Sequence, residues 1–142
     1  MEKISSVIFY SMDQSIRTYR MFAQKRLKEN GLKITIDQWL VLKTINENPD
    51  IAQNELADMV FKDNASVTRI IELLVKSDYL ERKKDQNDRR KSVLKITKLG
   101  SKTIEKVYQV VQENRQIALT GINQAELEIV DRVLKKISQN CK

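Results

Sequence analysis

Apolar side chains recur every three or four residues along nearly the whole chain, and this spacing constrains the fold most because it gathers them on one helix face. The spacing is interrupted once. Between residues 79 and 97, the runs "YLERKK" and "SVLKIT" alternate apolar with polar residues, as strands do, and flank the polar loop "DQNDRRK". Pro49 and the three glycines are expected between the periodic segments, where chain breakers belong. The sequence therefore predicts a mainly α-helical fold with one small β-hairpin.

The order of these segments predicts a winged helix-turn-helix. Helices are expected at residues 3–30, 35–47, 64–77, 98–119 and 123–139, with a compact helix following a short extended stub at Ile51. Thr35 and Asn64 are expected to be N-caps, and Asn123 is expected to form a capping box with Glu126. Two short helices followed directly by a hairpin define a winged helix, and 142 residues fit a single domain.

The terminal helices carry more apolar surface than a compact monomer of this size can bury. We expect buried positions at these residues: Ile4, Ile8, Met12, Ile16, Tyr19, Ala23 and Leu27 in the first helix, Ile104, Val107, Tyr108, Val111 and Ile117 or Ala118 in the fifth, and Leu127, Val130, Val133, Leu134 and Ile137 in the last. A symmetric dimer would bury this surface.

Charge and composition narrow the class of protein. The net charge is +7, and nine bases against four acids fall between Lys76 and Gly100. Such a local positive field suits a polyanion such as nucleic acid, although a solvated basic face would have the same composition. The chain has no histidine and a single cysteine, Cys141, so we expect no enzyme, no metal and no cofactor. No apolar run could span a bilayer, and the N-terminus lacks a secretory signal, so a cytoplasmic protein is expected.

Three stretches resemble the MarR family of bacterial regulators, named for multiple antibiotic resistance. They are "TIDQWLVL", "NELADMVFKDNASVTRIIELLVKSDYLER" and "DQNDRRKSVLKITKLG". The resemblance implies a DNA-binding lobe at 35–97 and dimerisation helices at 1–32 and 98–142. It also implies a homodimer that usually represses transcription from a pseudo-palindromic operator in double-stranded DNA, and that a small phenolic or lipophilic effector often releases. The peroxide-sensing and zinc-sensing branches are disfavoured, because residues 3–30 lack cysteine and the chain lacks histidine.

The helix at 64–77 would read a major groove and the hairpin an adjacent minor groove. The residues expected at DNA on that helix are Asn64, Ala65, Ser66, Thr68 and Arg69, and Arg69 is suited to a bidentate contact with guanine. On the wing, Arg89 and Arg90 can reach the minor groove. The resemblance makes Arg90 the inserting residue and Asp88 its support, with phosphate contacts at Lys84, Lys91 and Lys95. Asp78 stands where the family often has glycine, and Asp tolerates the left-handed conformation.

Aromatic residues on the helices around the family's ligand cleft are candidates for effector binding. They are Tyr10, Tyr19, Phe22, Trp39 and Tyr108, with Arg17 as a counter-charge for an acidic ligand. Simple core packing is the alternative for each of them. For the whole chain, the alternative function is a winged-helix interaction module without specific DNA binding. That reading predicts loss of the basic wing, which this sequence retains.

Overall fold

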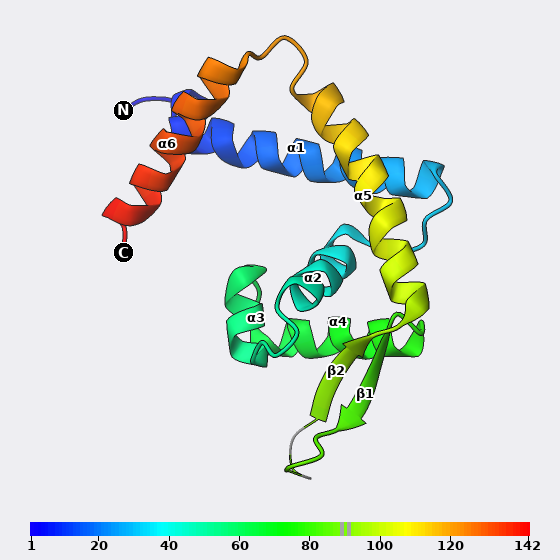
Figure 1. The fold of residues 1–142 in the computed structure, drawn as a ribbon. Helices are drawn as coiled ribbons and strands as arrows, with labels where there is room; N and C mark the ends of the chain where they lie inside the picture. The colour runs from blue at the N-terminus through cyan, green and yellow to red at the C-terminus, as the bar shows by residue number, and fades with distance from the viewer. Residues whose placement is uncertain (89, 91) are drawn as a thin grey trace.

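The computed structural model describes residues 1–88, 90 and 92–142, so Arg89 and Lys91 lie outside the described residues. The elements, in chain order, are a 3-10 turn (Ile4–Ser6), α1 (Ile8–Glu29), α2 (Ile36–Glu47), α3 (Gln53–Met59), α4 (Asn64–Lys76), β1 (Leu80–Lys84), β2 (Ser92–Ile96), α5 (Lys98–Ala118) and α6 (Gln124–Asn140). The predicted mainly helical fold with a two-stranded wing is confirmed (Figure 1). The stub at Ile51 is not a strand, and the two-stranded wing is the one sheet among the described residues.

The core lies in the winged lobe and continues up to the junction of α1 with α5. Each of α2, α3, α4, β1 and α5 contributes at least one buried aliphatic side chain, and α1 contributes Leu27 near its C-terminal end. Burying a side chain of this size stabilises a fold by about 1.5–3 kcal/mol. The largest fully buried hydrophobic side chains are Leu27, Ile34, Leu42, Leu56, Ile71, Leu74, Leu80, Val41, Val67 and Val107.

Helix starts follow the predicted caps with one correction. Thr35 and Asn123 each form the full capping box, the latter with Glu126 as expected. The predicted cap at Asn64 is wrong, because α4 is capped by Asp63, whose Oδ1 accepts the backbone N–H of Ser66 at 2.7 Å. A carboxylate makes a stronger, charge-assisted bond to this N–H than an amide does, so the helix begins one residue earlier. The N–H of Ser66, followed by its hydroxyl, lowers the pKa of Asp63.

The wing is an antiparallel pair whose register decides which face points inward. Leu80 pairs with Ile96 and Arg82 with Leu94. Leu94 is half-buried while Val93 is exposed, so Leu94 lies on the inward face of β2 and Val93 on the outward face. Asp78 has φ 64°, as expected for a residue replacing glycine. It ends α4 in a Schellman motif, in which Tyr79 N–H donates to Leu74 O at 3.0 Å.

Gly100 lies inside α5 rather than between elements, which corrects the prediction for this glycine. The base of the wing packs directly against it. Thr97 N–H donates to Tyr79 O at 3.2 Å, and Thr97 Oγ1 donates to Asp78 O at 2.6 Å while accepting Gly100 N–H at 2.9 Å. A Cβ on Gly100 would overlap the Tyr79 carbonyl oxygen and lie 3.0 Å from the Ile96 side chain. Only glycine therefore allows α5 to begin this close to the wing.

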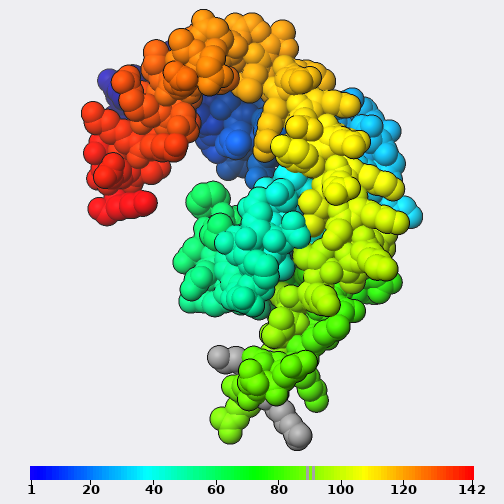
Figure 2. Space-filling model, viewed as in Figure 1, coloured from blue at the N-terminus to red at the C-terminus, as the bar shows by residue number. Residues whose placement is uncertain are grey.

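The predicted burial of the terminal helices does not hold within one chain. No residue of α6 is buried, and α1 buries only Ala23 and Leu27. In α5, Ile104, Val107 and Val110 are buried, whereas Tyr108, Ile117 and Ala118 are exposed and Val111 is half-buried. Figure 2 shows α1, α5 and α6 arching over a hollow that opens towards α3. Within the described part of the chain, no helix has both the length and the hydrophobicity that crossing a bilayer requires.

Candidate nucleic-acid interface and internal cavity

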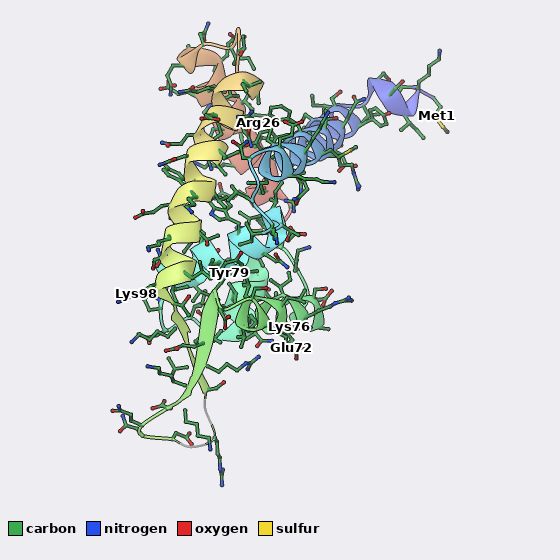
Figure 3. The ribbon with its side chains drawn as sticks, turned by 90° about the vertical axis from the view of Figure 1, so that its right-hand side faces the viewer. Met1, Arg26, Glu72, Lys76, Tyr79 and Lys98 are labelled. Carbon is green, nitrogen blue, oxygen red and sulfur yellow. The ribbon has the colours of Figure 1, made fainter. Side chains whose placement is uncertain are left out.

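Helix α4 turns one face to the outside at the lower edge of the lobe, beside the wing (Figures 1 and 3). Asn64, Ala65 and Arg69 are exposed there, and Ser66 and Thr68 are half-buried. Among the described residues, the Arg69 guanidinium has no hydrogen-bond or ion-pair partner. The five predicted side chains of this helix therefore occupy one stretch of surface, with the single arginine uncommitted.

The hydroxyl groups on this face are already committed within the protein. Thr68 Oγ1 donates to Asn64 O at 2.9 Å and accepts from Gln53 Nε2 at 2.6 Å, while Ser66 Oγ donates to Asp63 Oδ2 at 3.1 Å. What Thr68 retains for a partner is its methyl group. Sequence reasoning missed Gln53, the first residue of α3. Its polar character at a helix start was the one available signal.

The wing carries the predicted bases on exposed strands. Lys84 and Lys95 are exposed on β1 and β2, and Arg90 is exposed at the tip. Arg90 N–H donates to Asp88 Oδ1 at 3.0 Å, and support of the Arg90 side chain by Asp88 stays a prediction. An equivalent bond from Asn87 N–H to Asp85 Oδ1, also 3.0 Å, shapes the preceding turn. The predicted contacts at Arg89 and Lys91 fall outside the described residues.

A cavity of about 190 Å³ lies between α1, α2 and α5. Its lining residues are Ile16, Tyr19, Arg20, Ala23, Leu27, Ile36, Trp39, Leu40, Val107, Val111, Asn114 and Arg115. Of the six predicted effector residues, this list contains Tyr19 and Trp39. Phe22 lines a separate open hollow, and Tyr108 lines a groove that shares Trp39 with the cavity. Arg17 instead pairs with Asp13 along α1, and Tyr10 lines none of these spaces and is exposed.

Two residues that line the cavity each carry a buried donor with no partner within the described residues. The two donors are the indole N–H of Trp39 and the Nδ2 of Asn114, which is 0% exposed. Arg26 Nε donates to Asn114 Oδ1 at 3.0 Å, and a guanidinium can only donate, so the amide oxygen must face Arg26 and the NH₂ must face away. Leaving such a donor unpaired costs about 1–3 kcal/mol.

The charge around the cavity is positive. Arg20 and Arg115 line it, and no acidic residue does. Apolar walls, two unpaired donors and two arginines together suit a small molecule that carries an acceptor or a negative charge. Sequence reasoning missed Asn114, although a lone amide within the valine stripe of α5 was a signal for it.

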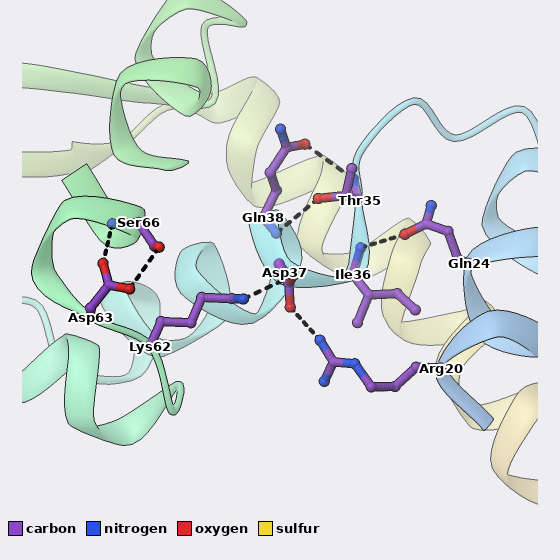
Figure 4. Close-up of polar contacts among 9 residues, drawn as sticks. All are labelled: Arg20, Gln24, Thr35, Ile36, Asp37, Gln38, Lys62, Asp63 and Ser66. Carbon is purple, nitrogen blue, oxygen red and sulfur yellow. Dashed lines mark hydrogen bonds and ion pairs between the residues drawn. The ribbon is translucent and has the colours of Figure 1, made fainter. Parts of the chain in front are cut away.

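Polar contacts join the cavity wall on α1 to the start of α4 (Figure 4). Asp37, in the first turn of α2, pairs with Arg20 through Oδ1 and with Lys62 through Oδ2, the second at 3.2 Å. Gln24 Oε1 accepts Ile36 N–H at 3.0 Å and ties the same turn to α1. Lys62 immediately precedes Asp63, the cap of α4.

Comparison with known proteins finds similarity to MarR proteins and other transcriptional regulators. The sequence model of the MarR family matches residues 34–92. The HTH-type transcriptional regulator BilQ of Clostridium symbiosum is 25% identical over 121 residues, which cover 85% of this chain and 83% of BilQ. An E. coli MarR mutant complexed with operator DNA matches with a TM-score of 0.77 at 25% identity, over 96% of this chain and 99% of that one. BpsR of Bordetella bronchiseptica, whose DNA binding is regulated by 6-hydroxynicotinic acid, matches in fold with a TM-score of 0.85 at 22% identity, over 97% of both chains.

Proposed function

We propose that this chain, a member of the MarR family of winged helix-turn-helix transcriptional regulators, represses transcription as a homodimer bound to a pseudo-palindromic operator. Members of this family act by binding rather than by catalysis. The observation that carries this proposal is that α4 exposes Arg69, which has no partner among the described residues, in a chain whose wing exposes further bases. A module that had lost DNA binding would have no reason to keep both.

The proposed contacts divide into those that read bases and those that position the protein. Arg69 would make a bidentate contact with guanine, and the Thr68 methyl would contact a thymine methyl in the major groove. Arg90 would enter the neighbouring minor groove. The remaining proposed contacts, to phosphates or to nearby base edges, are Asn64, Ala65, Ser66, Lys84, Arg89, Lys91 and Lys95, with Asp88 shaping the wing tip.

The apolar surface of the terminal helices supports the dimer. Exposed large side chains there include Ile4, Ile8, Phe9, Ile16, Met21, Ile117, Ile122, Ile129, Val130, Val133 and Leu134. Monomeric proteins rarely leave so much contiguous apolar surface in water, and a two-fold arrangement buries it on both chains. The same symmetry would place two α4 helices about one turn of DNA apart.

The cavity beside Trp39 supports control by a small effector. Its volume of about 190 Å³ is comparable to that of engineered cavities that hold benzene, roughly 150 Å³. A single-ring carboxylate or phenolate could bury its ring among the aliphatic walls and accept hydrogen bonds from Trp39 and Asn114. We therefore propose a small aromatic acid or phenol as the class of effector.

The test is fluorescence anisotropy with labelled DNA from upstream of the protein's own gene and with a scrambled duplex, each at several salt concentrations. The wild type should prefer the upstream duplex, and Arg90→Ala should weaken that binding by about 1–3 kcal/mol. Lys25→Ala, which removes a charge from the exposed surface of α1, is the control and should bind like the wild type. Equal weak binding to both duplexes, followed by failure to select any preferred site from random DNA, would favour the interaction-module alternative.

A further inference from the structure

We propose that Asp37 is a positioning residue that couples the effector cavity to the recognition helix α4, and that an anionic effector weakens DNA binding by competing with Asp37 for Arg20. This inference rests on the proposed function and names its regulation. It concerns a residue that contacts neither the cavity nor the exposed face of α4. Asp37 is absent from the cavity lining, and the α4 face begins beyond the Lys62–Asp63 turn.

A single carboxylate uses both of its oxygens to join two distant parts of the chain. Oδ1 accepts from Arg20, which lines the cavity on α1, and Oδ2 pairs with Lys62, between α3 and α4 (Figure 4). The adjacent Asp63 caps α4 through Ser66. The path from the cavity wall to the start of the recognition helix therefore runs through two ion pairs and one covalent step along the backbone.

Asp37 is held firmly enough to transmit a displacement. It lies in the first turn of α2, where the helix dipole favours a negative charge. The Thr35–Gln38 capping box closes this turn, and the Gln24–Ile36 bond ties it to α1. The position of Asp37 relative to α1 is thus set by hydrogen bonds between side chains and the backbone of this turn. The ammonium of Lys62, by contrast, is held by the charge that Asp37 presents.

An anion in the cavity would alter that charge balance. It would meet Arg20 and Arg115, with no acidic residue on the wall. As Arg20 turns to the ligand, Asp37 loses the cation on Oδ1 and is drawn towards Lys62. The turn that carries the α4 cap would then move relative to α1. By linkage, operator binding must weaken effector binding by the same factor.

The substitution Asp37→Asn separates this proposal from simple electrostatics. Removing an acid from a DNA-binding protein should tighten DNA binding by raising its positive potential. The bridge predicts the opposite, because an asparagine has one carbonyl oxygen and can hold only one of the two cations. Since partly exposed ion pairs contribute up to about 1 kcal/mol, we expect the operator affinity to fall about two- to fivefold per protomer.

The matched control is Glu47→Gln, which removes an acid from α2 whose partner, Lys43, lies on the same helix. This variant should bind DNA at least as tightly as the wild type. The melting temperature of each variant, at fixed concentration, checks that the fold is retained. An Asp37→Asn variant that melts like the wild type but binds DNA as Glu47→Gln does, or more tightly, would overturn the proposal.

A double-mutant cycle tests whether Arg20 and Asp37 act as one unit. Arg20→Gln alone should also lower the operator affinity, by more than the surface control Lys25→Gln. The double variant Arg20→Gln/Asp37→Asn should bind no more weakly than the weaker single variant, because the bridge can be lost only once. Additive losses would show that the two residues act separately and would refute the coupling.

Benzoate and its uncharged analogue benzamide test the competition. At constant ionic strength, benzoate should lower the operator affinity of the wild type and benzamide should not, and Asp37→Asn and Arg20→Gln should lose the response to benzoate. No effect of benzoate on the wild type, or an equal effect of benzamide, would overturn competition for Arg20. If the wild type prefers no DNA sequence at all, the proposed function fails instead, so the two failures are distinguishable.

Discussion

Replacing Gly100 by alanine tests how closely α5 and the wing are fitted together. The added Cβ would overlap the carbonyl oxygen of Tyr79, and it would lie 3.2 Å from the carbonyl carbon and 3.0 Å from Ile96 Cγ2. The carbonyl cannot rotate away as a flexible side chain would, because it is backbone and accepts the Thr97 N–H. Relief therefore requires the base of the wing to move away from α5.

Two opposing effects set the change in the free energy of unfolding for Gly100→Ala. Alanine is better than glycine within a helix by about 1 kcal/mol, so an open site would gain that much. Overpacking a rigid site costs about 1–3 kcal/mol, and a backbone neighbour places this site at the upper end. We expect a net loss of about 1–2 kcal/mol, or roughly 3–7 °C in melting temperature for a chain of this length.

Thermal unfolding followed by circular dichroism at fixed protein concentration measures this loss. Ser101→Ala, at the next and exposed position of α5, is the control and should raise the melting temperature slightly through helix propensity. If Gly100→Ala also raised it, the close approach of α5 to the wing would be refuted. Operator affinity should fall together with stability, because the displaced strands carry Lys84 and Lys95.

Three further predictions concern single side chains. Thr68→Val should keep the operator affinity measured by anisotropy, because the hydroxyl is already bonded to Asn64 O and Gln53. Thr68→Ser, which lacks the methyl group, should lower that affinity about fourfold. The reverse order would show that the hydroxyl, and not the methyl, contacts the base. Leu134→Glu on the exposed face of α6 should shift the mass measured by light scattering from dimer to monomer, and an unchanged mass would count against that interface. The pKa of Asp63 is lowered in the folded protein, so its contribution to stability is present above the unfolded pKa, about 4, and is lost as the pH falls through the folded value. The gap in urea midpoint between wild type and Asp63→Asn should therefore shrink as the pH falls through the unfolded pKa of about 4 and below it, and a constant gap would contradict this.

Local patterns predicted the features that depend on neighbouring residues. The change of period around residues 79–97 marked the wing, because strand and helix place side chains with different periods. The capping boxes at Thr35 and Asn123 follow from spacings of three residues. The left-handed backbone at Asp78 was expected from the resemblance, because the family often has glycine there and Asp tolerates this conformation. Between Asp63 and Asn64, spacing alone could not choose, and the charge of the carboxylate decided.

Features that depend on distant residues were not predictable in this way. The unpaired amide of Asn114 arises because Arg26, 88 positions earlier, takes its oxygen. The role of Asp37 depends on Arg20 and on Lys62, which meet it from two other elements. Helical periodicity marked Val130, Val133 and Leu134 as apolar, and the excess of apolar surface indicated that one chain could not bury all of it, but neither could show which positions stay exposed. A periodic pattern identifies the apolar face of a helix but does not show which element packs against that face.

Because α6 is not buried, its local stability should differ from that of the core helices. None of the 17 residues of α6 belongs to the buried core that runs from Leu27 to Val110. An isolated helix of about this length is only marginally stable in water, since its stability comes mainly from packing. Its amide hydrogens should therefore exchange with solvent much faster than those around Val41 and Leu42 in α2. With a second chain as its packing partner, this exchange would slow as the protein concentration rises, and α2 would show no such dependence.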